Sequence, residues 1–386
     1  MFRSISGRNH GLLAIPFNWV LVFYLGTELG TVLCYPENML TLRKLLESLG
    51  TIPTTTAWYL TDLAESRGKQ ALFTKQTPQR LKVLREHSLI ESAVSSNRIE
   101  GVEIEGKRIG TVIFGNRILR DRDEEEVRGY RKALALIHEK GPKLTISEKN
   151  IRELHRLSRG EIWDAGKYKE KDSDIIEHQP SGRTRVRFKT VSARATPKAM
   201  NELTQTWKEA NRSRELQPMI ALAAFNLDFL CIHPFRDGNG RVSRLLLLLE
   251  AYHLGFDVGR YISLERIIEE NKERYYETLE ISSQRWHEGE SDPWPFVNFV
   301  LSIFRIAYKE LESRVEKGVP KRGEKRELIL QAILQTTETF RIADIQHACP
   351  DVGLEHIRKT LAELQREKIV KCLGKGQSAS WKRIKG

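Results

Sequence analysis

The sequence predicts a mainly α-helical protein: a helical core with one β-hairpin beside it, followed by a C-terminal winged helix-turn-helix domain. From Thr55 onward, apolar residues recur at spacings of three and four, which is the helical period. The one long interruption, 172–191, alternates Thr184, Val186 and Phe188 with arginines, as a strand of a β-hairpin does. With 386 residues, of which 40% are hydrophobic, the chain can bury more than one core.

The helical patterns and their interruptions divide the chain into five parts. We expect a poorly determined segment over 1–54, a helical region over 55–123 and a catalytic domain over 124–311. Residues 312–326 are highly charged and contain glycine and proline, which is typical of an interdomain linker. Residues 327–386 contain three short helical patterns followed by two short strands, and this order predicts the winged helix-turn-helix domain.

The beginning of the chain differs from the rest. Within 12–35, the apolar residues are interrupted by Pro16, Asn18 and Glu28, so no run of about 20 uncharged apolar residues remains to cross a membrane. Charged amphipathic character begins only after Met39, which we interpret as the start of translation, with a signal peptide as the weaker alternative. We therefore expect the first 38 residues to be unnecessary for folding.

The charge and cysteine content narrow the class of partner and the compartment. Lys and Arg number 63 against 51 Asp and Glu, a net charge of +12, which favours polyanionic partners such as nucleotides or nucleic acid. The four cysteines have no paired C-x-x-C spacing, so neither a zinc site nor a disulfide framework is indicated. A cytoplasmic protein fits these features best.

The segment 233–244, HPFRDGNGRVSR, is the strongest candidate for a functional site. It lies between an apolar helical stretch and five consecutive leucines, so this polar loop is expected at the mouth of a buried helical pair. Gly238 and Gly240 allow close backbone approach, and the N–H groups that follow them can converge on an anion at the start of the next helix. We therefore interpret the loop as an anion-binding site and not as a surface turn.

The side chains of this loop suit phosphoryl or nucleotidyl transfer. Arg241 and Arg244 lie three residues apart, hence on one helix face, where both can reach a polyphosphate. Asp237 offers one hard oxygen ligand for Mg²⁺, and His233 can accept a proton near neutral pH. Each residue alone has an ordinary interpretation as a helix terminator, a turn or a solvated pair, but their combination between two apolar helices favours a site.

This segment resembles the signature of the Fic family, H-x-F-x-D-G-N-G-R-x-x-R, at every specified position. The resemblance implies a protein adenylyltransferase that uses ATP and Mg²⁺ to move AMP onto a Tyr, Thr or Ser hydroxyl. Related Doc-type kinases usually carry Lys at the position of Gly240, so the glycine in this chain favours transfer of AMP over transfer of phosphate. The resemblance implies a general base at His233, a Mg²⁺ ligand at Asp237, an α-phosphate cradle at Gly238, Asn239 and Gly240, and β- and γ-phosphate contacts at Arg241 and Arg244.

The resemblance extends over about 55–299. The hairpin occupies the place of the family's flap, which holds a target segment by strand addition, and the residues before it resemble a GKYR segment. The stretch 271–279 is similar to the family's adenine-side helix and implies that Asn271, Tyr275 and Tyr276 lie near the base, the alternative for the tyrosines being ordinary helix core.

A second, shorter pattern lies upstream in 95–101, SSNRIEG. It is similar to the family's inhibitory signature, with Ser96, Glu100 and Gly101 at the specified positions. The resemblance implies that Glu100 pairs with Arg244 and so withholds this arginine from the γ-phosphate. The alternative is a glutamate on a solvated helix end.

The C-terminal domain is a candidate for DNA binding or for protein interaction. Arg358 and Lys359 lie on its recognition helix, and further basic residues follow in the wing. Three functions therefore compete: an AMP transferase, a DNA-binding transcriptional regulator and a Doc-like protein kinase. The expected partners are ATP and an unidentified protein target, which could be the chain itself. DNA and a second copy of the chain are further candidates, and no membrane partner is expected. The basic residues of the wing are Lys371, Lys375, Lys382 and Arg383.

Overall fold

The computed structural model describes most of the chain from Leu40 to Ile384. The described residues are 40–384 without 49, 76–77, 106–107, 115–118, 161, 179–183, 214, 317–323, 337–338, 350–351 and 375–378. The predictions for 12–35, for a start at Met39 and for Lys375 concern residues outside this part.

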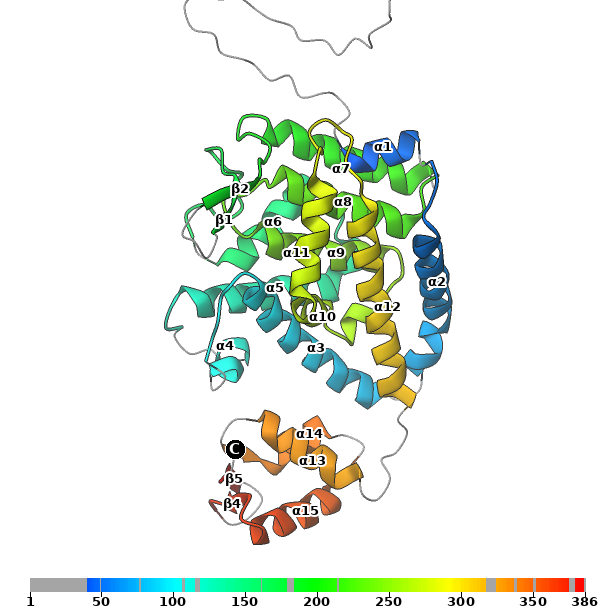
Figure 1. Ribbon diagram of the computed structural model, residues 1–386. Helices are drawn as coiled ribbons and strands as arrows, with labels where there is room; N and C mark the ends of the chain where they lie inside the picture. Colours follow the sequence, from blue (N-terminus) through cyan, green and yellow to red (C-terminus); the bar gives the residue numbers. More distant parts are fainter. Residues whose placement is uncertain are drawn as a thin grey trace, which may run out of the picture.

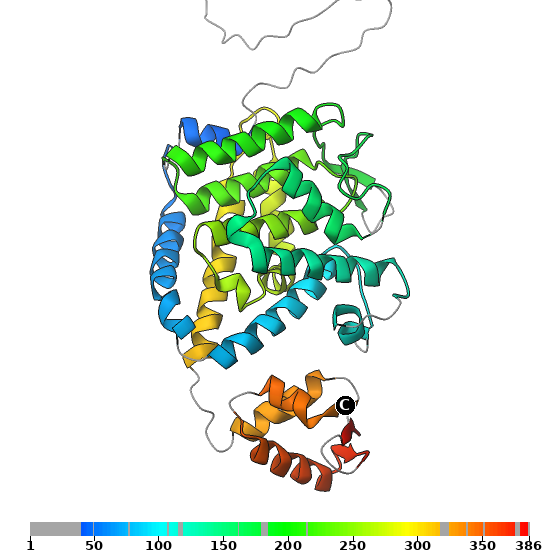
Figure 2. The same ribbon diagram turned by 180° about the vertical axis from the view of Figure 1, so that it is seen from behind.

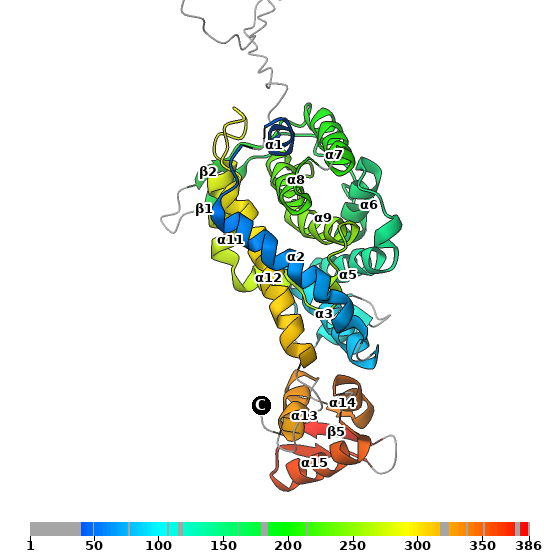
Figure 3. The same cartoon turned by 90° about the vertical axis from the view of Figure 1, so that its right-hand side faces the viewer.

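Two buried helices, α8 (Pro218–Ile232) and α9 (Asn239–His253), form the centre of the main body. Figure 3 shows them between α5, α6 and α7 on one side and α2 and α12 on the other. Residues of α8 from Met219 onward are all buried, because this sequence is apolar all round and is covered on every side. The surrounding helices are α5 (Arg122–Lys140), α6 (Glu148–Arg159), α7 (Thr196–Ser213), α2 (Thr54–Lys75), α11 (Lys272–Ser283) and α12 (Trp294–Glu316).

The helices before residue 123 belong to this same body. Figure 1 shows α3 (Pro78–Ile99) running below α5 and α10 (Leu264–Glu270), and α3 packs against both. Leu40 and Leu42 are fully buried, and α1 (Thr41–Glu47) packs against α8. One continuous hydrophobic core therefore joins the parts expected as 1–54, 55–123 and 124–311. The smaller elements are α4 (Ile109–Phe114) and the 3₁₀ turns η2 (Gly141–Lys143) and η3 (Val258–Arg260).

The predicted β-hairpin is confirmed. Strand β1 (Ile175–His178) pairs antiparallel with β2 (Thr184–Phe188), and the expected turn at 180–183 lies outside the described residues. In Figure 2, which shows the molecule from behind, α5 and α6 cross the face beside the hairpin. The mainly helical fold is therefore as predicted.

The C-terminal residues form a module with a hydrophobic core of its own. Its antiparallel sheet has the order β3-β5-β4, of which β3 was not predicted. The helix-strand-helix-helix-strand-strand order agrees with the winged-helix prediction, which stays a prediction. The expected linker, 312–326, is too long at both ends, because α12 runs to Glu316 and α13 begins at Glu324. The elements are α13 (Glu324–Gln335), β3 (Thr339–Arg341), α14 (Ile342–Ala348), α15 (Leu354–Arg366), β4 (Val370–Cys372) and β5 (Ser380–Arg383).

The hydropathy of the helices and the state of three cysteines can be stated for the part of the chain that the structure describes. Among its helices, none combines the length and the hydropathy that crossing a bilayer requires. Cys231, Cys349 and Cys372 are free thiols.

Candidate active site

His233 is the C-cap residue of α8 and the first residue of the loop that follows. It adopts a left-handed conformation with φ 51°, and its Nδ1 lies 3.3 Å from the carbonyl oxygen of Leu230. A carbonyl only accepts, so this contact requires the proton on Nδ1 and leaves Nε2 unprotonated. Burial, assisted by the positive charge of Lys169, lowers the pKa of His233 to about 4. The imidazole is therefore neutral at physiological pH.

Lys169 is held close to His233 by two contacts. Its Nζ donates to Thr190 Oγ1 at 2.7 Å and to the carbonyl oxygen of Ile232 at 3.3 Å. Burial lowers the pKa of Lys169 to about 8, against the attraction of Asp172. This lysine stands at the last position of the segment that resembles GKYR, where the family pattern has Arg, but no sequence pattern indicated its proximity to His233.

Asp237 is surrounded by guanidinium groups. Its side chain is 53% exposed, and Oδ2 accepts from Arg159 Nη1 at 2.8 Å and from Arg122 Nη2 at 3.2 Å. Oδ1 accepts from the N–H of Gly238 at 2.6 Å and lies 3.6 Å from Arg241 Nη2. Although burial acts to raise it, the charges of Arg159 and Arg241 hold the pKa of Asp237 below its ordinary value.

Glu126, on α5, binds three of the site's arginines. It is almost fully buried, and its Oε2 accepts from Arg241 Nη1 at 2.5 Å. Its Oε1 accepts from Arg159 Nη1 at 2.5 Å and from Arg122 Nε at 3.0 Å. Sequence reasoning missed this residue, because it lies in a run of acidic residues that is typical of a solvated helix start.

Arg244 is buried and contacts the end of α3. Its Nη2 donates to Glu100 Oε1 at 2.8 Å and to the carbonyl oxygen of Ser96 at 2.8 Å, and its Nε donates to Ser96 Oγ at 2.9 Å. Burial acts to lower the pKa of Arg244, but the Glu100 carboxylate raises it. A methyl group at Gly240 would overlap Glu100 Oε1. The Glu100 carboxylate therefore lies directly against the first turn of α9, beside Arg244. Gly101 follows with φ 82°, at the end of the helix as expected.

His155, on α6, contacts the loop between α8 and α9, and the sequence analysis did not predict this residue as part of the site. Its Nδ1 accepts from the N–H of Gly166 at 2.8 Å, so Nε2 carries the proton and donates to the carbonyl oxygen of Asp237 at 3.0 Å. Its ring stacks on Phe235 with centroids 3.8 Å apart. Burial lowers the pKa of His155 to about 4, so this neutral tautomer persists at physiological pH. The loop is thus fixed by α6 as well as by its own residues.

Asn239 braces the loop instead of facing the site. Its Oδ1 accepts from the N–H of Phe235 at 2.9 Å, and its Nδ2 donates to the carbonyl oxygen of Phe235 at 2.7 Å. Both ends of the side-chain amide are therefore occupied. Of the other residues expected in the α-phosphate cradle, Gly238 already donates its N–H to Asp237 Oδ1 at 2.6 Å.

The three residues expected near adenine occupy different environments. Asn271 donates to the carbonyl oxygen of Ile267 at 2.8 Å, and Tyr275 is buried against the aromatic side chains of α12. Tyr276 is partly buried and donates to the carbonyl oxygen of Ile99, next to Glu100, at 3.3 Å. Tyr276 therefore lies beside Glu100, while Tyr275 is buried in the core next to Arg244.

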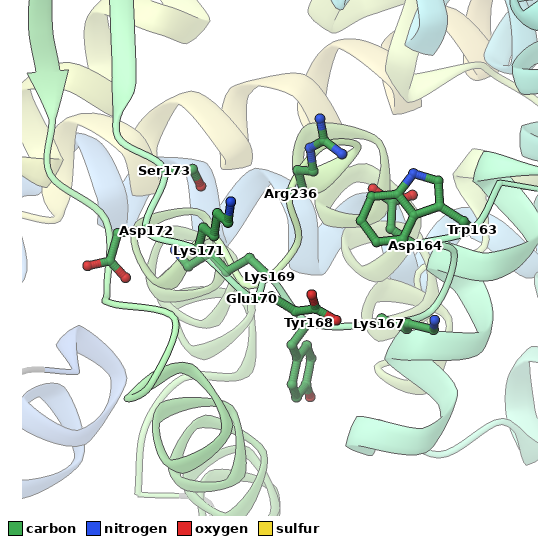
Figure 4. Close-up of a pocket in the computed structure, with 10 residues that line it drawn as sticks. All are labelled: Trp163, Asp164, Lys167, Tyr168, Lys169, Glu170, Lys171, Asp172, Ser173 and Arg236. Carbon is green, nitrogen blue, oxygen red and sulfur yellow. The ribbon is translucent and has the colours of Figure 1, made fainter.

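Two adjoining cavities open at the loop. A cavity of about 470 Å³ lies between Arg236 and the segment before the hairpin, and Figure 4 shows its lining, with Trp163, Asp164 and Arg236 on one side. A second cavity, of about 260 Å³, shares these three residues and is also lined by Arg122, Arg159, Ile162 and Asp237.

Residues 145–251 match the family model described as Fic/DOC family. The chain contains a Fic domain. It is 25% identical over 198 residues to "Protein adenylyltransferase Fic" from Drosophila persimilis, an alignment that covers 49% of this chain and 34% of the relative. The chain thus spans about a third of the length of this curated relative.

Solved structures of Fic proteins share the fold. A Fic family protein from Desulfovibrio desulfuricans matches with a TM-score of 0.57 and 22% identity, covering 87% of this chain and 98% of that one. A Fic domain containing signaling protein from Bacteroides thetaiotaomicron matches with a TM-score of 0.55 and 22% identity, covering 66% and 97%. The recognition of a Fic domain from the loop signature is therefore confirmed.

Proposed function

We propose that this Fic domain transfers AMP from ATP to a Tyr, Thr or Ser hydroxyl of a protein. The observation that carries the proposal is the loop between α8 and α9, where neutral His233 and the carboxylate of Asp237 flank the N-terminus of α9. An acceptor oxygen attacks the α-phosphorus and gives its proton to Nε2 of His233. The bond from the α-phosphorus to the bridging oxygen breaks, and pyrophosphate leaves with that electron pair.

Asp237 is the residue that would hold Mg²⁺ in this proposal. The described residues contain no group of three or more acidic, His or Cys side chains that could bind a metal by themselves. One half-exposed carboxylate nevertheless fits an ion whose other ligands are phosphate oxygens and water. Bound there, Mg²⁺ would neutralise phosphate charge, while Arg159 and Arg241 keep the carboxylate ionised.

Glu100 is proposed to inhibit the transfer. Its carboxylate occupies Arg244 and lies against Gly240, at the place where the helix N-terminus would receive phosphate oxygens. A γ-phosphate would lose its arginine and meet a negative charge, so ATP would bind with its α-phosphorus out of line. Positioning is the main source of rate in phosphoryl chemistry, and misplacement therefore suppresses it.

The experiment that tests the function compares two labels of ATP. The Glu100→Gly protein is incubated with cell lysate and with ATP labelled at the α- or the γ-phosphate, and His233→Ala is added in the same background as control. We expect label on protein from α-labelled ATP alone, and its loss with His233→Ala while ATP binding persists, because the base acts on the acceptor hydroxyl. Label from γ-labelled ATP alone would identify a Doc-like kinase, and undiminished labelling by the His233→Ala protein would refute the mechanism.

We propose duplex DNA binding by the C-terminal module as a second candidate function. Arg358 and Lys359 are exposed on α15, and Lys371 and Lys382 are exposed on the sheet. Such residues can neutralise phosphates, which makes affinity fall steeply with salt. Electrophoretic mobility shifts with duplex DNA at two salt concentrations test this function. No retardation of the wild type, or equal retardation of an Arg358→Ala, Lys359→Ala double variant, would exclude it.

A further inference from the structure

The smaller cavity beside Asp237 brings together three arginines from three different segments. Arg122 comes from the start of α5, Arg159 from the end of α6 and Arg236 from the loop itself. Arg122 and Arg159 lie outside the Fic signature, and Arg236 stands at one of its unspecified positions. The function proposed above places Mg²⁺ at Asp237 on the edge of this cavity but assigns no anion to the three arginines.

Arg159 is built into the site and is not a mobile surface side chain. Its side chain is 3% exposed, and Nη1 is held between Glu126 and Asp237. A methyl group at Gly238 would lie 3.0 Å from Cδ of Arg159, so this side chain packs against the N-cap of α9. Its Nε is buried and has no hydrogen-bond partner in the described part of the chain. A buried donor without a partner is costly, which favours a ligand or water at this position.

The other two arginines reach the cavity from its exposed sides. Arg122 is 57% exposed and contacts Asp237 and Glu126. The guanidinium of Arg236 stacks over the ring of Trp163, 5.5 Å from its centroid, and Figure 4 shows both at the same side of the larger cavity. Arg122 and Arg159 share the carboxylate of Asp237, so a cation bound by Asp237 would leave them only Glu126, which also binds Arg241.

The charges of the lining indicate which anion fits. Three guanidiniums face two carboxylates, those of Asp237 and Asp164, and Asp164 Oδ1 is buried with no partner among the described residues. The carboxylates suit a divalent cation and its water, and the arginines suit phosphate oxygens. A magnesium-bound polyphosphate matches both halves of this lining better than a bare anion does.

We propose that this cavity receives the magnesium pyrophosphate that leaves the α-phosphorus, with Arg122, Arg159 and Arg236 as its ligands. The inference rests on the proposed AMP transfer, in which the bridging oxygen departs with the electron pair of the broken bond and pyrophosphate must leave the site. The cavity adjoins Asp237 and the N-cap of α9, so the leaving group can pass to it without crossing the buried pair of Glu100 and Arg244.

Calorimetric titration of the full chain with pyrophosphate and Mg²⁺, without ATP, tests the proposal. Arg122→Gln removes one ligand from a largely exposed position, and Arg156→Gln is its matched control. Arg156 is 55% exposed, is paired with Glu153 and lies on α6 outside the cavity. We expect the dissociation constant to rise about tenfold for Arg122→Gln, as for the loss of one charge-assisted hydrogen bond, and to stay unchanged for Arg156→Gln. Circular dichroism of both variants checks the fold.

Arg244→Gln distinguishes this cavity from the motif's own phosphate contacts. If pyrophosphate binds, and only Arg244→Gln weakens it, the leaving group stays beside Arg244 and the inference is wrong. No binding at millimolar pyrophosphate, or equal weakening by Arg122→Gln and Arg156→Gln, overturns it as well. If pyrophosphate binding depends on Arg122 but the protein transfers no α-label, the pyrophosphate site is supported and its role for a leaving group is refuted. This outcome separates a failure of the proposed AMP transfer from a failure of the proposed site.

Discussion

His233 owes its protonation state to two causes that can be separated by mutation. Burial is the larger cause and the charge of Lys169 the second, and together they lower the pKa of His233 to about 4. In the proposed mechanism, His233 can accept a proton only when its imidazole is neutral. The transfer rate should therefore be lost as the pH falls through about 4 and should not change near neutral pH on account of this residue.

Replacing Lys169 should move that loss to higher pH. In the active Glu100→Gly background, Lys169→Met removes the positive charge, which makes protonation of His233 easier and raises its pKa. The exposed Lys171 supplies the matched control, Lys171→Met, which should leave the profile in place. The measurement is the initial rate of α-label transfer against pH for the three proteins. An acid limb at the same pH in the Lys169→Met and Lys171→Met proteins would contradict the assignment.

Gly240 is required by its contact with Glu100. A methyl group there would overlap Glu100 Oε1, so Gly240→Ala must displace the carboxylate from the first turn of α9. We expect a loss of about 1–3 kcal/mol in the free energy of unfolding, as overpacking of a buried site causes. In the Glu100→Gly background the loss should be much smaller, because the overlapping atom is absent. Urea unfolding of the four proteins measures this, and equal losses in both backgrounds would show that the cost of the methyl group does not arise from its overlap with Glu100.

At the scale of elements, α3 carries the residues to which we assign the inhibition. It packs against α5, α9 and α10, and this packing brings its last turn, with Ser96 and Glu100, to Arg244. The pair is only partly shielded, since the Glu100 side chain is 31% exposed while that of Arg244 is 2% exposed. A change at the end of α3 can therefore release the arginine without breaking the core.

A rate cycle across this contact tests the switch. Glu100→Gly should raise α-label transfer, because Arg244 becomes free for the γ-phosphate. Arg244→Ala should remove that gain, and mutating Glu100 in the Arg244→Ala background should change little, since the partner is already absent. Initial rates of the wild type, both single variants and the double variant decide it. An unchanged rate for Glu100→Gly, or a double variant as active as Glu100→Gly, would make Glu100 a surface carboxylate.

At the scale of the whole molecule, one buried carboxylate joins the start of the described chain to its centre. Asp228, on α8, accepts from the N–H groups of Thr41 and Leu42 at 2.9 Å each and from Trp286 Nε1 at 2.7 Å. It therefore caps α1 and fixes the segment before α12. Burial raises the pKa of Asp228 to about 6, and the three donors oppose this rise.

Removing this carboxylate should destabilise the whole body. Asp228→Ala leaves three buried donors without an acceptor, and we expect it to cost about 3–5 kcal/mol in the free energy of unfolding, as breaking a buried charged network does. The exposed Asp174 provides the control, Asp174→Ala, which should change the free energy by less than about 0.5 kcal/mol. Urea unfolding measures both, and a cost for Asp228→Ala below about 1 kcal/mol would mean that water replaces the carboxylate.

The sequence predicted the helices, the hairpin and the Fic loop because each depends on local patterns. Continuous apolar stretches mark α8 and α9, and Gly238 and Gly240 mark the turn between them. It did not predict β3, whose three residues are too few to show an alternation. It also set the linker too long, since the charged ends of α12 and α13 have the composition of a linker although they are helical.

By itself, then, the sequence determined the mainly helical fold, the Fic loop and the residue types available for its chemistry. Only the tertiary structure decided which of these residues meet. Glu100 and Arg244 are 144 residues apart, and the resemblance suggested their pairing without showing it. Glu126 and His155 belong to no motif, and their roles follow from the packing of α5 and α6 beside α9. Periodicity encodes which face of a helix is buried, but the neighbour that buries it is chosen by packing over the whole chain.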